Sequence, residues 1–332
     1  MLNSISIAIE EMITEDEVKR NWSKEGVLVS VICTAYNHES YICNAINSFI
    51  LQETTFPFEI IINDDKSTDS TLDILSLYKR KYPNIIKLIS HECNQYSLNI
   101  SPYKFIHELA SGKYLALCEG DDFWNTRDKL AIQFDILEAN PNSDLCIHSA
   151  YILESDKTTD KDSWNYRKQY YSLRDVFESP GQFAPTSSYF FRKSLIEGNE
   201  VFRTIYFQAG IIDFFIEVFS ANNDKKIIAI NRKLSTYRVQ AAGSWTEANL
   251  KNFLLKVQNT RKFVYNIKCA SSQFNHKYKH LFSRKISEEI QDCIVVGVKN
   301  REYLKVAIFS LKNIFELNLI RLLGRAITKV MS

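Results

Sequence analysis

The sequence of 332 residues contains little proline and glycine, 6 and 9 residues respectively. This scarcity argues against a collagen-like or low-complexity chain. No stretch of 18 consecutive apolar residues occurs, so the sequence predicts no membrane-spanning helix. The content of 45% apolar and 24% charged residues is instead typical of an ordinary globular protein, and the length is that of about two domains.

Seven cysteines are present, but none forms a CxxC pair, and most lie within apolar runs. This pattern favours reduced core thiols over disulfides or a zinc site. The N-terminal segment lacks the basic start, long apolar stretch and small-residue cleavage site of a secretory signal. We therefore expect a cytoplasmic protein.

Charge of either sign is not in excess. Lys and Arg number 41 and Asp and Glu 39, which gives a formal net charge of +2. This balance excludes attraction of the whole molecule to nucleic acid phosphates. Any anionic partner must therefore be held by a local site.

Short apolar runs rich in β-branched residues alternate with segments of helical spacing over the first half of the chain. Such alternation predicts an α/β fold with a largely parallel sheet. Proline and glycine mark several of the boundaries, and Ser67 or Thr68 is a candidate helix cap. The expected strands are residues 27–36, 58–63, 85–90 and 113–118, and the expected helices are 38–52, 67–78, 101–111 and 127–139.

The remaining residues divide the chain into three predicted parts. Residues 1–26 form a charged leader, 27–245 the sheet domain and 246–332 a mostly helical region. Within the sheet domain, two strands are expected at 226–230 and 234–239. Residues 154–175 are polar and aromatic without a clear period, which indicates a substrate-facing loop.

Pairs of carboxylates follow two of the expected strands. Asp64 and Asp65 come after 58–63, and Asp121 and Asp122 come after 113–118. Ligands of open α/β sheets bind beyond the carboxyl ends of the strands. Asp64 is equally interpreted as a helix cap, whereas two adjacent acids after an apolar strand repel each other unless a cation is near. A hard ion, Mn²⁺ or Mg²⁺, held by carboxylates and by substrate phosphates indicates a nucleotide diphosphate ligand.

Four motifs carry a resemblance to a known family: VSVICTAYNHESYICNAINSFILQ, FEIIINDDKSTDST, GKYLALCEGDDFW and LSTYRVQAAGSW. In this order they cover about Val27 to Trp245, and the set resembles the family 2 glycosyltransferases with a GT-A fold, of the type found in bacterial surface-polysaccharide assembly. No Walker loop, GxGxxG motif or zinc-type spacing competes with it. The resemblance implies a mostly parallel sheet flanked by helices, with a helical C-terminal region.

The same resemblance implies an inverting transfer of a sugar from a UDP- or dTDP-sugar donor to a hydroxyl of a polysaccharide or lipid-linked glycan. Asp65 matches the acid that contacts the pyrimidine, whose N3–H a carboxylate can accept, while an aromatic side chain offers a face for the ring. Asp122 matches the metal ligand, Asp121 the position nearer the ribose or the metal, and Glu119 is a further candidate. The other expected nucleotide-binding residues are Thr34, Tyr36, Asn37 and Glu39.

Asp213 lies where the resemblance places the catalytic base, at a helix start in GIIDFFIEVF. Its apolar neighbours would desolvate the carboxylate and raise its pKa toward a useful range for a proton acceptor. An ordinary N-cap is the alternative interpretation. Glu217, one turn further, is the substitute candidate.

The chain departs from the family pattern after the last strand, where Tyr-Arg-x-His is replaced by a sequence ending in Gln240. An amide is a poor replacement for an imidazole metal ligand, so coordination is looser or Arg238 contacts the diphosphate. Metal dependence is thus less firmly predicted than the fold. For Trp124 and Lys129 we expect packing or helix-surface roles.

Two other activities and one surface stay open. A nucleotidyltransferase also needs paired acids and metal, but CTAYNHES lacks its Gly-rich basic loop, and a non-catalytic nucleotide-sugar-binding scaffold is compatible with Gln240. The C-terminal segment carries an apolar stripe at helical spacing together with basic residues. It either packs on the sheet domain or rests on the anionic cytoplasmic face of the inner membrane. The stripe comprises Leu304, Ile308, Leu311, Phe315, Leu319, Leu322 and Ala326.

Overall fold

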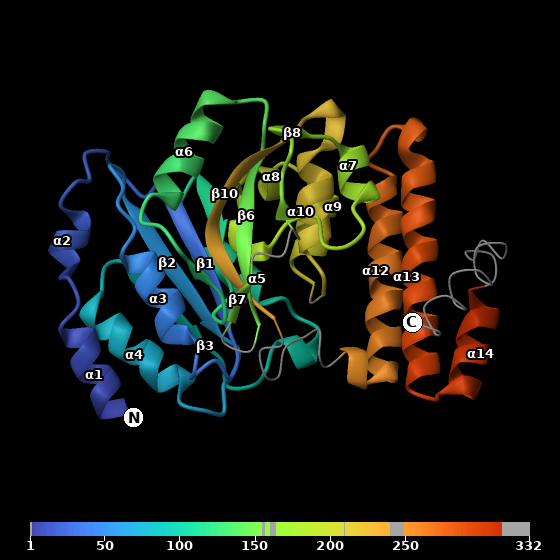
Figure 1. The fold of residues 1–332 in the computed structure, drawn as a ribbon, viewed down its shortest axis with the longest axis horizontal. Coiled ribbons are helices and arrows are strands. Elements are labelled where there is room, and N and C mark those ends of the chain that lie inside the picture. Colours follow the sequence, from blue (N-terminus) through green and yellow to red (C-terminus); the bar gives the residue numbers. More distant parts are fainter. Residues whose placement is uncertain (1, 155–156, 160–163, 209, 240–248, 314–332) are drawn as a thin grey trace. The chain divides into compact units, whose positions relative to one another are not determined.

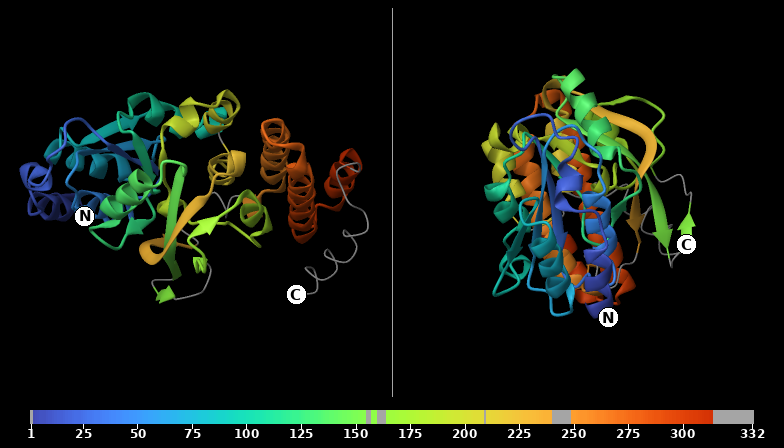
Figure 2. Two further views of the ribbon diagram at one scale, coloured as in Figure 1. Left: turned by 90° about the horizontal axis from the view of Figure 1, so that it is seen from above. Right: turned by 90° about the vertical axis from the view of Figure 1, so that its left-hand side faces the viewer.

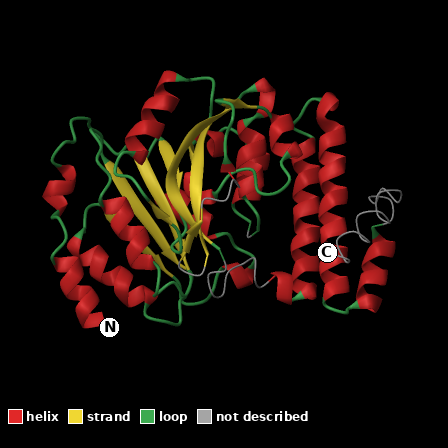
Figure 3. Cartoon of the chain, viewed as in Figure 1, coloured by secondary structure: helices red, strands yellow, loops and turns green. Residues whose placement is uncertain are grey.

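The computed structural model describes residues 2–154, 157–159, 164–208, 210–239 and 249–313. The chain forms two units, Met1–Val239 and Gln240–Ser332 (Figure 1). The predicted boundary at residue 245 lies outside the described residues. The first unit contains the sheet, and the second is helical (Figure 3).

The first unit is built on one sheet whose strand order is β3-β2-β1-β4-β9-β6-β10-β5, with β7 paired to β6 and β8 to β10. The first four strands are mutually parallel, as predicted, while β9 is antiparallel to both β4 and β6. The strands are β1 (Val29–Ala35), β2 (Phe58–Asp64), β3 (Ile86–Ser90), β4 (Tyr114–Leu117), β5 (Phe123–Trp124), β6 (Leu145–Glu154), β7 (Lys157–Thr159), β8 (Tyr170–Tyr171), β9 (Phe190–Arg192) and β10 (Ile227–Arg238).

The two strands expected at 226–230 and 234–239 are a single strand, β10. It pairs in parallel with β6, and the register shifts between Ile230 and Ser235. No glycine or proline stands between the two halves, so the chain absorbs the irregularity as a bulge instead of turning. As a result, the end of β10 lies beside the end of β6.

Helices cover both faces of the sheet, since every residue of β2 is buried. The helices of this unit are α1 (Leu2–Glu10), α2 (Glu15–Lys19), α3 (Ile42–Ile50), α4 (Thr71–Lys81), α5 (Pro102–Leu109), α6 (Lys129–Ala139), α7 (Leu173–Glu178), α8 (Ser194–Glu197), α9 (Glu200–Tyr206) and α10 (Asp213–Ser220). Short 3₁₀ turns occur at Tyr96–Leu98, Thr186–Ser188 and Asn222–Asp224.

The predicted leader packs against the rest of the first unit. Helix α1 lies beside α4 (Figure 1), and the ammonium of Lys81 donates to the carbonyls of Glu10 and Met12 at 2.6 and 2.8 Å. The Tyr82 hydroxyl donates to the Ile13 carbonyl at 2.7 Å. Ile9 is buried against the core, so residues 1–26 help to cover the outer side of α4.

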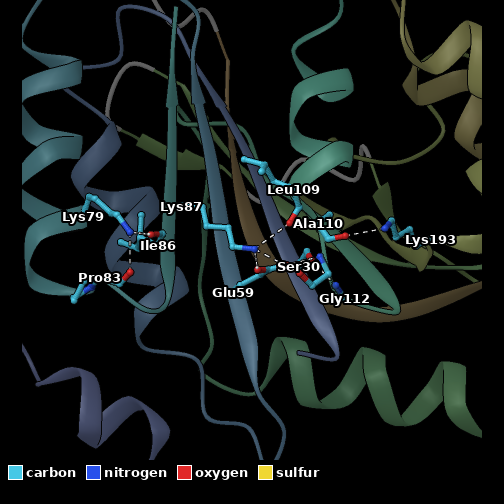
Figure 4. A network of polar contacts seen from close by, with 11 residues as sticks. Ser30, Glu59, Lys79, Pro83, Ile86, Lys87, Leu109, Ala110, Gly112 and Lys193 are labelled. Carbon is cyan, nitrogen blue, oxygen red and sulfur yellow. Dashed lines mark hydrogen bonds and ion pairs between the residues drawn. The ribbon is translucent and has the colours of Figure 1, made fainter. Parts of the chain in front are cut away.

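A buried polar network ties the amino ends of the strands together (Figure 4). The Glu59 carboxylate accepts hydrogen bonds from the Ser30 hydroxyl and the Ser111 N–H, both at 2.7 Å, and forms an ion pair with Lys87 at 2.6 Å. The Gly112 N–H donates to the same Ser30 hydroxyl at 2.9 Å. This network fixes the turn that leads into β4 and leaves the opposite, carboxyl ends of the strands for the acids.

The described residues of the second unit contain α12 (Phe253–Ser271), α13 (Lys279–Lys299) and α14 (Tyr303–Lys312), with a short 3₁₀ turn at His276–Tyr278. Helices α12 and α13 run side by side (Figure 2). A Cβ on Gly297 would lie 2.6 Å from the Phe253 ring, so glycine allows close packing there. None of the described helices is long and apolar enough to cross a membrane.

Candidate active site

The loop after β1 is hydrogen-bonded to the loop after β2. The Asn37 N–H donates to the Ser67 hydroxyl at 2.9 Å, and the Asn37 side-chain oxygen accepts from the Thr68 N–H at 2.7 Å. Asn37 and Lys66 have positive φ angles of 57° and 65°, which turn each loop toward the other. Residues 67–70 are therefore engaged by the first loop, and α4 begins at Thr71 instead of the predicted Ser67.

Glu39 and His38 complete this pairing. The Glu39 carboxylate accepts from the Ser70 N–H at 2.9 Å, and the Glu39 N–H donates to the Asp69 carboxylate at 3.1 Å. The His38 N–H donates to the Thr71 hydroxyl at 2.8 Å. The two loops are thus joined by hydrogen bonds into one surface, here called the ledge. In it the side chains of Asn37 and Glu39 accept hydrogen bonds from backbone N–H groups.

Asp65 supports a third loop beside this ledge. Its side chain is only 6% exposed, and its two carboxylate oxygens accept from the backbone N–H groups of Gln95 and Tyr96 at 2.6 and 3.0 Å. A carboxylate has about four acceptor positions, so capacity for about two more donors is left. Asp64 is fully buried and accepts from the Ser67 N–H at 3.1 Å, so it holds the loop after β2 and does not cap α4, which begins at Thr71.

Tyr36 is 44% exposed at the tip of β1 and presents its ring to solvent. Thr34, two residues earlier, is half-buried, and its carbonyl accepts the N–H of Gly120 at 3.0 Å. A Cβ on Gly120 would lie 2.7 Å from the His38 ring and 2.9 Å from the Ile42 side chain. Only glycine therefore lets the EGDD segment lie directly against the loop after β1.

Asp122 is the most constrained acid of this segment. It is 1% exposed, and its Oδ1 accepts the N–H of Arg238 at 2.8 Å. Among the described residues, Oδ2 has no hydrogen-bond partner. The Arg238 guanidinium donates to the Asp121 carbonyl at 3.1 Å and lies 4.5 Å from the centre of the Tyr41 ring. The end of β10 thus orients the carboxylate of Asp122.

The neighbouring acids raise one another's pKa values. Burial, followed by the charges of Asp121, Asp213 and Asp122, raises the pKa of Glu119 well above its ordinary value. Burial and the charge of Asp121 likewise raise the pKa of Asp122. Such a group of carboxylates is fully ionised only with a nearby cation.

The residues present fit a divalent ion that is shared with a substrate. A buried carboxylate oxygen without a partner, Asp122 Oδ2, is a suitable ligand, and Asp121 is its neighbour. In the part of the chain that the structure describes, no group of three or more His, Cys, Asp or Glu residues could hold a metal by itself. Mg²⁺ and Mn²⁺ commonly take one or two carboxylates and complete their shell with phosphate oxygens. Gln240 lies outside the described residues.

Asp213 is the first residue of α10, and Ile212 occupies the N-cap position, so the predicted alternative of an N-cap does not describe it. The Asp213 carboxylate accepts from the Thr186 hydroxyl at 3.1 Å and from the Gln182 amide at 3.5 Å. Burial raises its pKa to about 6. A carboxylate with this pKa is ionised at neutral pH and is a stronger proton acceptor than an ordinary aspartate.

Glu217 lies one turn after Asp213 but inside the fold. Its side chain is 2% exposed and accepts a hydrogen bond of 2.5 Å from the Tyr189 hydroxyl. The charge of Glu217, after burial, contributes to the raised pKa of Tyr189. This carboxylate therefore has less access to a substrate hydroxyl than that of Asp213.

The side chain of Lys129 lies inside the fold, near the site. It is fully buried, its ammonium lies 4.2 Å from the centre of the Trp124 ring, and burial lowers its pKa to about 7. Of the two roles expected for Lys129, packing is confirmed and a helix-surface role is wrong. Trp124 is 4% exposed and donates to the Ser187 carbonyl at 3.1 Å, so it packs as expected.

Three further residues of the site, Tyr41, Gln182 and Thr186, were not singled out from the sequence. Tyr41 faces Arg238, and the other two contact Asp213. The only local signal was the proline-marked run PTSS, which indicates a turn and no chemistry. Their roles depend on contacts between segments more than 25 residues apart.

Comparison with known proteins identifies the family. The model of the family described as glycosyl transferase family 2 matches residues 30–198, about half of the chain. The chain belongs to glycosyl transferase family 2. The predicted family is thereby confirmed.

Protein Rv1520 of Mycobacterium tuberculosis is 30% identical over 228 residues, which are 66% of this chain and 61% of the relative. This chain thus spans about three fifths of the length of that relative. A UDP-Glc:α-D-GlcNAc-diphosphoundecaprenol β-1,3-glucosyltransferase, WfaP of Escherichia coli, is 33% identical over 129 residues, 39% of this chain and 48% of that protein.

The fold is shared with a solved structure, that of the mannosyltransferase PcManGT from Pyrobaculum calidifontis in complex with GDP-Man and Mn²⁺. The TM-score is 0.56 at 16% identity, and the likeness covers 100% of this chain and 93% of that one. At this identity the likeness concerns the fold alone. It confirms the predicted mixed α/β GT-A fold with helices in the C-terminal region.

Proposed function

We propose that this family 2 protein is an inverting glycosyltransferase, which moves a sugar from a UDP- or dTDP-sugar to a hydroxyl of a polysaccharide or lipid-linked glycan. The observation that carries the proposal is the buried carboxylate of Asp122, which the backbone N–H of Arg238 orients and the Ser187 hydroxyl approaches. The nucleotide would lie on the ledge formed by the loops after β1 and β2. Asp65 and Tyr36 then offer an acceptor and a ring face to the base.

Asp213 is the proposed base of the reaction. Its carboxylate takes the proton of the acceptor hydroxyl, and the oxygen attacks the anomeric carbon from the side opposite the diphosphate. The bond between that carbon and the diphosphate oxygen breaks, and the nucleoside diphosphate leaves with the electron pair. A single displacement of this kind inverts the anomeric configuration, and the raised pKa of Asp213 supports its part.

Asp122 and Asp121 would hold the divalent ion, Mn²⁺ or Mg²⁺, which when bound neutralises the departing diphosphate. Arg238 keeps Asp122 oriented through its N–H, and its guanidinium is fixed by the Asp121 carbonyl and the Tyr41 ring. The chain thus supplies one oriented carboxylate oxygen and leaves other ligand positions to the substrate.

The Asp122→Asn variant tests the donor site. It removes charge and one ligand oxygen, so Mn²⁺-supported binding of UDP should fall at least tenfold in calorimetry. Asp135→Asn, which changes an exposed carboxylate on α6, is the matched control and should bind as the wild type does. Unchanged UDP affinity in the folded Asp122→Asn variant would contradict the assignment.

We further propose that the protein works at the cytoplasmic face of the membrane, through α14. The buried side of this helix is formed by Val306 and Phe309, whereas Leu304 and Leu311 of the predicted stripe are 76% and 69% exposed, with Ile308 between them. Within the second unit the stripe therefore faces away from the helix pair. Lys305 and Lys312 lie beside the stripe, and the E. coli relative WfaP is named for a diphosphoundecaprenol acceptor, a lipid.

A vesicle flotation assay tests this membrane contact. The wild type should float with vesicles that contain anionic phosphatidylglycerol, and salt should weaken the interaction. Replacing Leu304, Ile308 and Leu311 by Gln should abolish flotation, whereas Leu98→Gln, an exposed leucine of the first unit, should not. If the triple variant aggregates and the wild type never floats, the stripe packs on protein.

A further inference from the structure

Trp164 lies close to the proposed base without contacting it directly. Its indole N–H donates to the Gln182 carbonyl at 3.1 Å, and the Gln182 amide reaches the Asp213 carboxylate at 3.5 Å. The side chain of Gln182 also contacts the Thr186 hydroxyl at 3.4 Å, the same hydroxyl that donates to Asp213. Gln182 therefore links the Trp164 indole to the Asp213 carboxylate through two hydrogen bonds.

Trp164 also contacts the strand end that orients the proposed metal-binding acid. The Trp164 and Tyr237 rings lie 5.4 Å apart in an edge-to-face arrangement, with an interplanar angle of 79°. Tyr237 directly precedes Arg238, whose N–H orients Asp122. The indole is thus located between the strand end that holds the metal acid and the residues that hold the base.

Neighbouring aromatic residues anchor the segment that carries Trp164. Tyr166 is buried, its hydroxyl donates to the Phe183 carbonyl at 3.0 Å, and its ring packs edge-to-face on Tyr171 at 5.5 Å. Trp164 itself remains half-buried. An aromatic side chain that is fixed in orientation, partly exposed and next to a catalytic acid is typical of a binding platform more than of core packing.

We propose that Trp164 is the stacking platform for the pyranose ring of the acceptor. The face of an aromatic ring is negative, and the C–H face of a pyranose carries partial positive charge, so the two attract while the sugar hydroxyls stay free. A sugar held on the indole would direct one hydroxyl toward Asp213. The inference rests on the proposed function and extends it by naming the acceptor contact.

Saturation-transfer NMR on the full chain tests the platform, with methyl β-D-glucopyranoside as the probe in the presence of UDP and Mg²⁺. Trp164→Ala should lower probe affinity about three- to tenfold, the usual range for one aromatic contact. Trp164→Phe should restore most of the affinity. Tyr170→Ala removes an exposed ring from the same segment and should change nothing.

Calorimetry with UDP and Mn²⁺ on the same variants separates the platform from the donor site. Unchanged UDP binding together with the loss of probe binding in Trp164→Ala supports the inference. Equal loss of UDP and probe binding overturns it, because the segment is then a structural support of the donor site. If UDP binds every variant and probe affinity does not depend on Trp164, the platform is refuted while the proposed function stands. If neither UDP nor dTDP binds even the wild type, the proposed function fails first and the platform with it.

Discussion

Replacing Asp213 by Asn separates proton transfer from donor binding. The substitution keeps nearly the same volume and can still accept a hydrogen bond from Thr186, so the start of α10 should fold as before. Removal of a general base typically costs about a hundredfold to ten-thousandfold in rate. We expect sugar transfer to fall by this amount while the dissociation constant for UDP with Mn²⁺ stays unchanged.

The pH dependence of the wild-type transfer rate gives a second, independent test of the role of Asp213. Burial raises the pKa of Asp213 to about 6, and the base acts in its ionised form, so the rate should fall as the pH drops through this value. About nine tenths of the carboxylate is ionised at pH 7 and about one tenth at pH 5, which gives a roughly tenfold loss. An ordinary aspartate with a pKa near 3.9 would lose only about a tenth of its activity over that range.

The assay measures release of nucleoside diphosphate in the presence of acceptor at several pH values, for the wild type, Asp213→Asn and Asp73→Asn. Asp73 is an exposed acid in the first turn of α4 and serves as the matched control. A folded Asp213→Asn variant with near wild-type transfer would refute the reasoning and move the role to another acid. A joint collapse of UDP binding and thermal stability would instead assign Asp213 a purely structural part.

Three further substitutions test the surroundings of the site. Asp65→Ala leaves two backbone N–H groups without their carboxylate, so thermal melting should show a loss of about 1–3 kcal/mol, and UDP binding should weaken more than that of bare diphosphate. Equal weakening for both ligands would contradict a contact between Asp65 and the pyrimidine of the nucleotide. Gly120→Ala should cost about 1–3 kcal/mol in urea unfolding, because the His38 ring must move, and an unchanged midpoint would show that the loop yields freely. Lys129 is buried with its pKa lowered to about 7, so its burial opposes folding, and this penalty decreases as the pH rises from 7 toward 10, by at most about 1.4 kcal/mol per pH unit. The Lys129→Met variant lacks this titration, so the difference in unfolding free energy between the two proteins should change with pH by that slope. A difference that is constant with pH would contradict the buried lysine.

The parallel strands of the first half of the sheet were predictable, because parallel buried strands have a local pattern, whereas the order of the strands was not predicted. The run at 58–63 is mostly apolar, with Glu59 and Asn63 as polar exceptions, and all of β2 is buried. The predicted start of one helix was wrong, because another segment competes for the side chain that was expected to cap it. Ser67 is a good helix cap, but its hydroxyl accepts the Asn37 N–H, so the helix begins at Thr71.

The site was predictable where one motif carries the chemistry, and not where two distant segments meet. Asp122 and Asp213 were named from the motifs that carry the family resemblance, and their roles stay predictions. The contacts of Gln182 with Asp213 and of Arg238 with Tyr41 could not, because they depend on how the ends of β10 and α10 approach other loops. Lys129 gave no signal at all, since a lysine at a helix start is most often solvated.

The hydrogen bonds between the loops after β1 and β2 have a consequence for engineering. Each loop supplies side chains that satisfy the backbone of the other, through Asn37 in one direction and Ser67 in the other. A graft that exchanges only residues 36–39 for those of a relative would remove the side-chain acceptors of the Thr68 and Ser70 N–H groups, whereas the bonds donated by the backbone N–H groups of residues 37–39 would remain. If the loops after β1 and β2 bind the donor as proposed, residues 36–39 and 66–71 must be transplanted together to transfer donor preference.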